Sequence, residues 1–117
     1  NIVFRNNVSY NDNNGIRVKG GNNTVFENLF LHNNVGVYLC CGSAGNVVYG
    51  NTFIGNSENA KDDKPTNLWS YDGMGNYWDD YTGADNDGDG VGDTSYQISG
   101  YGNREDSFPL MKPRWIA

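Results

Sequence analysis

Asparagine recurs at fixed positions along the first half of the 117-residue chain, and this repeat limits the folds that the chain can adopt. Segments of similar sequence begin at Asn1, Asn23 and Asn46, and asparagine stands at the first, sixth and eleventh positions of each. The columns are Asn1, Asn23 and Asn46; Asn6, Asn28 and Asn51; and Asn11, Asn33 and Asn56. Self-similarity at a period of about 22 residues is typical of a solenoid, in which each unit stacks on the preceding one.

Apolar residues form further columns between the asparagines. These columns are Val3, Val25 and Val48, and then Val8, Phe30 and Phe53. A glycine and a β-branched residue follow them, as Gly15-Ile16 and Gly36-Val37. Because side chains two residues apart share one face of a strand, each unit is interpreted as three short strands separated by turns. The sequence therefore predicts an all-β fold, a short parallel β-helix (β-solenoid) with about 22 residues per rung.

The asparagine columns are expected at the corners of this solenoid. Stacked asparagine side chains can form amide ladders, because each amide carries both a donor and an acceptor. Asparagine and glycine also tolerate the left-handed backbone that tight corners need. We therefore interpret the nine asparagines of the three columns as structural ladder residues.

Composition and charge exclude two classes of partner. Apolar residues make up 37% of the chain, and the mean hydropathy is −0.68. Aromatic residues nevertheless make up 14%, which is too many for a disordered chain. The net charge is −6, and no basic stripe is present to neutralise phosphates, so nucleic acid is not expected as a partner. No apolar run is long enough to span a membrane.

Residues 85–93 form an acidic, glycine-rich segment that resembles a calcium-binding loop. Calcium prefers six to eight oxygen ligands, and the expected ligands are Asp85, Asp87, Asp89, the carbonyl of Val91, and Asp93. The usual twelfth-position glutamate is replaced by Tyr96, so the remaining ligand is sought among Asp79, Asp80 and Asp106. The alternative is a solvated acidic linker. We expect one continuous domain, with rungs over residues 1–70 and an irregular calcium-binding cap over 71–117.

Two segments carry a resemblance to a known family. The rungs, with their asparagine columns and the following Gly-Ile or Gly-Val, look like the right-handed parallel β-helix repeats of NosD-like and archaeal surface proteins. The second half is similar to the ending of those proteins in Gly75-Asn-Tyr-Trp-Asp-Asp-Tyr81, the acidic loop, Asp93-Thr-Ser-Tyr96 and Asp106-Ser-Phe-Pro-Leu110. The resemblance implies an exported, calcium-containing β-helix. Related repeats are described as carbohydrate-binding or sugar-hydrolysing, but the resemblance does not by itself imply catalysis.

No catalytic constellation is expected. The predicted outward positions bring no two acids together, and Glu27 beside Arg5 favours a surface ion pair. A role in copper maturation is disfavoured, because His32, two methionines and an adjacent cysteine pair make a poor copper ligand set. Cys40 and Cys41 would point to opposite faces of a strand, which favours one core thiol and one surface thiol. The alternative is an intermolecular bond through the outward one.

Several surface features point to assembly or modification. Leu29, Leu31 and Ile54 are expected to form an exposed apolar patch, on which the apolar tail 108–116 can lie. The rung at Asn1 has no cap, so it is a template for another copy or the open end of a longer β-helix. Asn7-Val-Ser and Asn22-Asn-Thr are candidate N-glycosylation sites, although such triplets are common by chance in an asparagine-rich chain.

The leading hypothesis is an exported, calcium-stabilised, non-enzymatic structural module at the cell surface or outside the cell. It would stack end to end with other copies, as a homo-oligomer or a head-to-tail filament. One alternative is a carbohydrate-binding or carbohydrate-modifying surface domain, with glycan binding that depends on Trp69 or Trp78. The other is a C-terminal fragment of a larger NosD-like protein.

Overall fold

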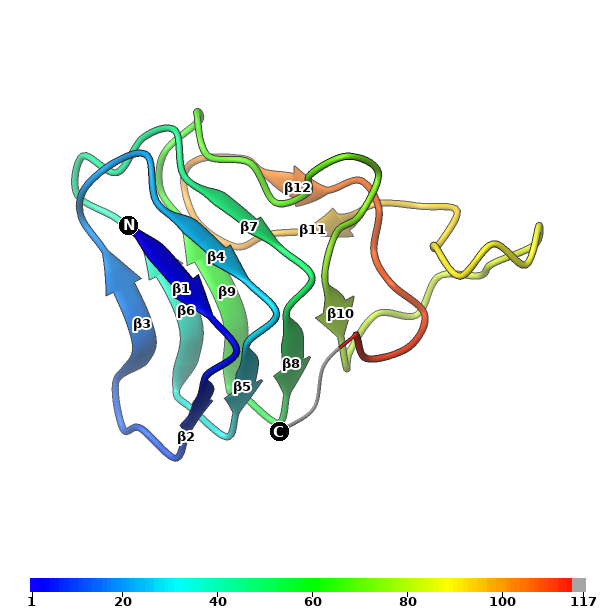
Figure 1. The fold of residues 1–117 in the computed structure, drawn as a ribbon, viewed down its shortest axis with the longest axis horizontal. Helices are drawn as coiled ribbons and strands as arrows, with labels where there is room; N and C mark the ends of the chain where they lie inside the picture. Colours follow the sequence, from blue (N-terminus) through cyan, green and yellow to red (C-terminus); the bar gives the residue numbers. More distant parts are fainter. Residues whose placement is uncertain (115–117) are drawn as a thin grey trace.

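The computed structural model describes residues 1–114, and these residues form strands and turns without a helix (Figure 1). Three successive rungs each contribute three short strands. The rungs are β1 (Ile2–Phe4), β2 (Asn7–Ser9) and β3 (Asn14–Val18); β4 (Thr24–Phe26), β5 (Leu29–Leu31) and β6 (Val35–Leu39); and β7 (Val47–Tyr49), β8 (Thr52–Ile54) and β9 (Glu58–Asp62). The prediction of a short parallel β-helix is confirmed.

Equivalent strands of successive rungs pair in parallel and in register. The three rung sheets have the orders β1-β4-β7, β10-β8-β5-β2 and β3-β6-β9, where β10 comprises Tyr77–Trp78. In the first sheet, Val3 pairs with Val25 and Val25 with Val48, so one apolar column of the sequence becomes a column in space. Each side chain therefore rests on its equivalent in the next rung.

The core consists of these inward columns and ends on aromatic rings. The rings of Phe30 and Phe53 are stacked with centroids 5.0 Å apart, and Trp78 lies 4.4 Å from Phe53 on the next level. Tyr96 is stacked on the far side of Trp78 at 4.2 Å, so one continuous pile of rings runs from the second rung into the cap. At Gly36 the rungs approach so closely that a Cβ atom would collide with the carbonyl oxygen of Asn59.

The structure differs from the expectation about which residue adopts the left-handed backbone at each corner. The left-handed backbone belongs to the residue before each ladder asparagine. At these positions stand Arg5, Glu27 and Gly50; Tyr10, His32 and Gly55; and Asn22 and Gly45. The ladder asparagines themselves keep ordinary backbone angles, because their function at the corner is performed by the side-chain amide. Left-handed φ values of 54° at Glu27 and 55° at His32 show that this turn is imposed on non-glycine residues as well.

The cap covers the last rung with irregular structure. Strand β10 adds to β8, and β11 (Tyr96–Gln97) pairs antiparallel with β12 (Glu105–Asp106) above it (Figure 1). Trp69 and Trp78 are each 1% exposed and close the end of the apolar core. Nothing in residues 1–114 forms a helix of the length and hydrophobicity that crossing a membrane requires.

Candidate functional site

The asparagine columns are continuous hydrogen-bonded ladders with one direction. In the middle column, the backbone N–H and Nδ2 of Asn6 both donate to Oδ1 of Asn28, at 2.9 and 3.0 Å. Asn28 donates in the same way to Asn51, and Asn51 to Asn76. The second N–H of each interior amide points backwards, as in the 2.9 Å bond from Asn28 Nδ2 to the carbonyl of Val3. Oδ1 of Asn28, Asn51 and Asn76 thus each accept from the preceding rung.

The two other columns follow the same rule. Asn11 donates to Asn33, and Asn33 donates to Asn56. Asn23 donates to Asn46, which donates to Asn67. Among residues 1–114, no side-chain hydrogen bond joins Asn1 to its column. Two residues outside the predicted columns, Asn67 and Asn76, extend the ladders into the cap.

Carboxylates receive the donors left over at the cap end. Asp106 accepts hydrogen bonds from the N–H of Asn76 at 2.7 Å, Nε1 of Trp78 at 2.8 Å and the N–H of Phe108 at 2.9 Å. Asp62 accepts in a parallel manner from Nδ2 of Asn67 and Nε1 of Trp69. An ionised carboxylate is an acceptor without a donor, so it is the chemical complement of a column that ends in N–H groups.

Two further carboxylates end the remaining column through an intermediary asparagine. Asn56 donates to Oδ1 of Asn59, and Asn59 donates in turn to Asp79 at 3.0 Å and to Asp80 at 3.0 Å. Asp79 also accepts the N–H of Gly55. The sequence offers Asp79, Asp80 and Asp106 as candidates for the remaining metal ligand, whereas the structure uses all three as ladder acceptors. A column of stacked amides ends in N–H donors that still need acceptors. Counting these donors could have identified the carboxylates that accept them.

Burial and hydrogen bonding oppose each other at Asp106. Burial raises the pKa of this carboxyl above its usual value, and the donors from Asn76, Trp78 and Phe108 act to lower it. A different balance holds at Asp63, on the outer surface between the last rung and the cap. The hydrogen bond from the Tyr38 hydroxyl, at 2.6 Å, lowers the pKa of Asp63, and the same bond raises the pKa of Tyr38.

The opposite end of the ladders has free acceptors. Within the described part of the chain, Oδ1 of Asn6 and Oδ1 of Asn11 receive no donor, in contrast to their equivalents one rung later. Strands β1, β2 and β3 each pair on one side only. The side chain of Ile2 is 72% exposed, and Val3 and Val8 are only partly buried. This end combines an unpaired parallel edge, an uncovered apolar core and unused amide oxygens.

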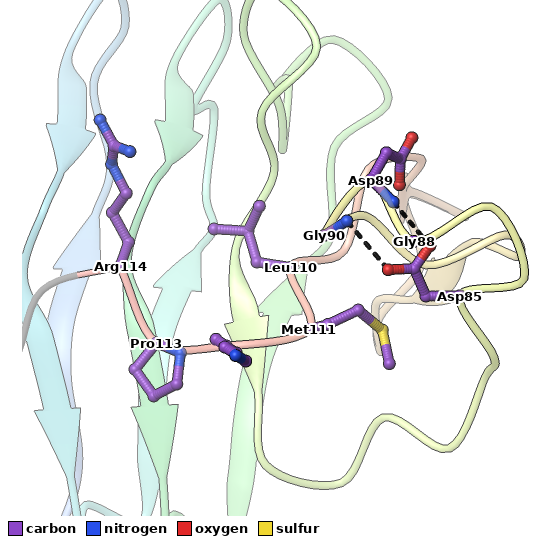
Figure 2. Close-up of a pocket in the computed structure, with 9 residues that line it drawn as sticks. Asp85, Gly88, Asp89, Gly90, Leu110, Met111, Pro113 and Arg114 are labelled. Atoms are coloured by element: carbon purple, nitrogen blue, oxygen red, sulfur yellow. Dashed lines mark hydrogen bonds between the residues drawn. The ribbon is translucent and has the colours of Figure 1, made fainter.

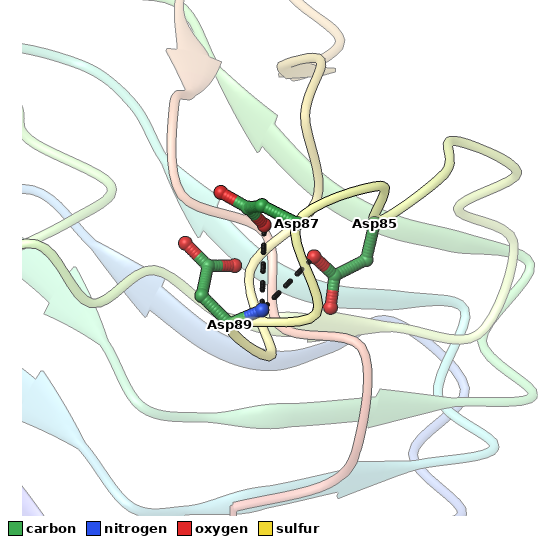
Figure 3. A group of neighbouring side chains, drawn as sticks. All are labelled: Asp85, Asp87 and Asp89. Atoms are coloured by element: carbon green, nitrogen blue, oxygen red, sulfur yellow. Dashed lines mark hydrogen bonds between the residues drawn. The ribbon is translucent and has the colours of Figure 1, made fainter.

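The acidic loop brings three of the expected metal ligands together. Carboxylate oxygens of Asp85, Asp87 and Asp89 lie within 4.8 Å of one another (Figure 3). Backbone N–H groups of the same loop donate to them, including Gly90 to Asp85 at 2.9 Å and Val91 to Asp89 at 2.9 Å. The bond from Gly90 is the main cause of a lowered pKa at Asp85, whereas the neighbouring Asp85 raises the pKa of Asp87.

Asp93, a further expected ligand, is engaged by another residue of the loop. Asp93 accepts the N–H of Asn86 at 2.8 Å and is not part of the group of three. Asp85 and Asp89 of this group line a pocket together with the C-terminal tail (Figure 2). The pocket is lined by Asp85, Gly88, Asp89, Gly90 and the tail residues Leu110, Met111, Lys112, Pro113 and Arg114. The segment is a hydrogen-bonded loop at the surface. This arrangement is compatible with the alternative of a solvated acidic linker.

Two surface expectations are wrong in this structure, and the alternative of glycan binding is not supported. Leu29 is 4% exposed and Leu31 and Ile54 are only partly exposed, so they form no open apolar patch. The tail runs past β10 instead, where Leu110 bridges to Tyr77 and to Val91, and its last residues 115–117 lie outside the described residues. Trp69 and Trp78 are buried and cannot present a face to a glycan. Asn7 and Asn22 of the two sequons are exposed.

The cysteines also differ from expectation. Cys40 and Cys41 are joined in a disulfide. The alternation of strand side chains does not apply to them, because β6 ends at Leu39 and Cys41 has a left-handed φ of 55°. Arg17 lies beside both sulfurs.

Soft and nitrogen ligands are scattered along the chain. His32 stands at a corner with its ring 5.2 Å from that of Tyr10, and the two cysteine sulfurs are bonded to each other. Within residues 1–114, the only group of three or more potential histidine, cysteine or acidic ligands is Asp85, Asp87 and Asp89. Copper prefers imidazole and sulfur ligands, so this oxygen-only group does not fit it.

Two curated relatives are similar to the chain. The probable ABC transporter binding protein NosD of Stutzerimonas stutzeri is 43% identical over 76 residues, which are 64% of this chain and 17% of the relative. The protein of the same description from Pseudomonas aeruginosa is 43% identical over 76 residues, 64% of this chain and 18% of the relative. The chain thus spans less than a fifth of the length of the curated relatives that it matches. Both are described as binding proteins, in agreement with the expectation of a non-enzymatic module.

The family comparison corrects one prediction and confirms another. The model of the periplasmic copper-binding protein (NosD) family matches residues 1–83. This family description points to copper, so the prediction of calcium as the cofactor is wrong, and three clustered aspartates are not sufficient to restore it. The prediction of an exported protein is confirmed by the periplasmic description. Because the match extends over most of the sequence, the chain belongs to the NosD family of periplasmic β-helix proteins.

Proposed function

We propose that this chain is a non-enzymatic module that ends the parallel β-helix of an exported binding protein. One further asparagine-cornered rung pairs with β1–β3, and the cap closes the opposite end. The observation that carries this proposal is the direction of the ladders, with free acceptors at one end and carboxylates at the other.

The free end selects its partner by hydrogen-bond polarity. Oδ1 of Asn6 and Oδ1 of Asn11 need N–H donors, and in each later rung those donors are the backbone N–H and Nδ2 of the preceding asparagine. Nδ2 of Asn6 would gain a carbonyl acceptor, as Asn28 does from Val3. A parallel rung with asparagines at its corners supplies all of these groups at once and also covers Val3 and Val8.

The capped end of another copy is a poor match for the same surface. It carries the acceptors Asp62, Asp79 and Asp106, and their oxygens already hold donors from their own chain. Acceptor facing acceptor forms no hydrogen bond, and an unpaired buried polar group costs free energy. Head-to-tail filaments of identical copies are therefore the less favoured assembly, and glycan binding through Trp69 or Trp78 is disfavoured by their burial.

The family is described as copper-binding, but the proposal for this chain rests on its architecture and not on a copper site. The described residues bring together no set of imidazole and sulfur ligands, so we assign this chain a scaffolding role. In that role the rungs provide a rigid rod of parallel strands, and the cap prevents further pairing beyond it.

An added rung tests the proposal. A copy of residues 23–45 is placed directly before Asn1, and thermal unfolding is compared with that of the unaltered chain. We expect the melting temperature to rise by about 5 °C, because the new rung adds one inter-rung interface over β1–β3, while the open end moves to the new rung. A control rung with alanine at its three ladder asparagines should give less than half of this gain. An unchanged melting temperature, or filaments of the unaltered chain in light scattering, would overturn the proposal.

A further inference from the structure

The disulfide between Cys40 and Cys41 lies at the end of β6 and has no part in the proposed function. Its two residues are consecutive, so the bond encloses almost no chain. The stabilisation that a disulfide gives through loop closure grows with the length of the enclosed loop. The turn is also held by backbone hydrogen bonds from Cys40 to Val18 at 3.0 Å and from Ser43 to Cys40 at 2.8 Å. Stability of the fold does not account for this disulfide.

A cation is placed against both sulfurs. Nε of Arg17 lies 3.3 Å from Sγ of Cys40, and Nη2 lies 3.5 Å from Sγ of Cys41. Arg17 comes from β3, one rung earlier, where it pairs with Tyr38 and lies over its ring at 5.9 Å. A guanidinium remains charged at all ordinary pH values, and a neighbouring cation favours the thiolate form of cysteine.

The two sulfurs differ in access. Cys41 is exposed, whereas Cys40 is 0% exposed. An external thiolate therefore has access to Cys41 and not to Cys40. The leaving sulfur is then that of Cys40, which has Nε of Arg17 beside it.

We propose that Cys40–Cys41 is a redox-active disulfide that exchanges with dithiols. The thiolate of a dithiol reductant attacks Sγ of Cys41, the bond between the two cysteine sulfurs breaks, and its electron pair moves to Sγ of Cys40. The second thiolate of the reductant then attacks its own sulfur in the mixed disulfide and releases Cys41 as a thiolate. Two protons from solvent complete the two thiols, so the protein gains two electrons and the reductant becomes a cyclic disulfide. Arg17 is a positioning residue that stabilises the departing sulfur.

The exchange is measured with dithiothreitol at pH 7, by counting alkylated thiols with mass spectrometry over time. We expect complete reduction with an unchanged circular dichroism spectrum, and we expect glutathione alone to give a mixed disulfide on Cys41. Arg17→Gln should slow reduction about fivefold, since the leaving thiolate loses its cation. The matched control is Arg5→Gln, which removes an outward arginine from a distant corner and should leave the rate unchanged.

A second variant separates redox chemistry from folding. In the double variant Cys40→Ser and Cys41→Ser, the melting temperature should stay within about 2 °C of the oxidised protein, as expected for so short a loop. Unfolding of this variant, loss of the folded spectrum on reduction, or equal reduction rates for Arg17→Gln and Arg5→Gln would each overturn the proposal. The same holds if glutathione is found on Cys40.

Discussion

The rungs and the cap are stabilised in different ways. In the rungs each contact is repeated, so Val25 has an equivalent above and below, and Asn28 both receives and gives the same pair of hydrogen bonds. In the cap each contact occurs once, as in the three donors that meet at Asp106. The difference shows that a repeating region transfers its unmet hydrogen bonds to its ends, where non-repeating residues must satisfy them.

The largest effect is expected inside a ladder. Asn51 is fully buried, and Asn51→Ala removes the acceptor for two donors of Asn28 and the donor for the carbonyl of Val25. We expect the free energy of unfolding to fall by about 4 kcal/mol, because several buried polar groups lose their partners together. Urea unfolding monitored by tryptophan fluorescence measures the change.

Asn6→Ala is the matched control in the same column. Asn6 is exposed, and its backbone N–H keeps its bond to Asn28 after the substitution. The expected loss is below about 1 kcal/mol. Equal losses at positions 6 and 51 would show that depth in the ladder does not matter and would remove the basis of the comparison.

The next effect concerns the carboxylate that ends the middle column. Asp106→Asn keeps the size of the side chain but places an N–H₂ group among the donors of Asn76, Trp78 and Phe108. We expect a loss of about 2 kcal/mol, the cost of an unsatisfied buried donor. Asp12→Asn, at an exposed position of the first rung, serves as the control and should be neutral. A neutral Asp106→Asn would mean that the cap does not require an acceptor without a donor.

A smaller effect of opposite sign is expected at a corner. Glu27 has a left-handed φ of 54°, which costs about 1 kcal/mol for a residue with a Cβ atom. Glu27→Gly removes this strain, but glycine loses more conformational entropy on folding than glutamate does. The free energy of unfolding should therefore rise by about a few tenths of a kcal/mol or more. Glu27→Ala removes the same 3.7 Å ion pair with Arg5 but keeps the Cβ atom, so it should not stabilise. Stabilisation by both variants would point to the ion pair.

The smallest effect lies where rungs and cap meet. Asp63 accepts the Tyr38 hydroxyl of the second rung and the N–H of Tyr101 in the cap, and the bond from Tyr38 lowers the pKa of Asp63. A lowered pKa in the folded state means that this contribution is present above the ordinary pKa and is lost as the pH falls through the folded value. The melting temperature of the wild type should therefore exceed that of Asp63→Asn at pH 7, and the difference should shrink below about pH 4.

The rungs could be predicted because repetition is visible in a sequence. Columns of asparagine, valine and phenylalanine at one period determine which residues pair, and the register of β4 against β7 follows from them. The left-handed corners were assigned to the wrong residue, because Arg5, Tyr10, Glu27 and His32 are not residues that favour this backbone. Their conformation is imposed by pairing with the neighbouring rung, because Arg5 and Tyr10 of the first rung adopt it as Glu27 and His32 of the second rung do.

The cap and its surroundings could not be predicted in the same way. The sequence offers Asp79, Asp80 and Asp106 only as candidates for a remaining metal ligand, since nothing local distinguishes a carboxylate that ends a ladder from one that binds a cation. Leu29 was placed at the surface from strand alternation, although its side chain is 4% exposed. The cysteine pairing was missed because β6 ends one residue before Cys40. The period of the repeat does not describe any of these features, because each occurs once in the chain.

The ladders also give the solenoid an electrical polarity. Each side-chain carbonyl points toward the first rung, so the amide dipoles of a column add along the axis as peptide dipoles add in an α-helix. The positive end of this sum is at the cap, where Asp62, Asp79 and Asp106 provide compensating negative charge. The negative end is at β1–β3. The polarity is therefore the reverse of that of an α-helix, whose N-terminal end is positive.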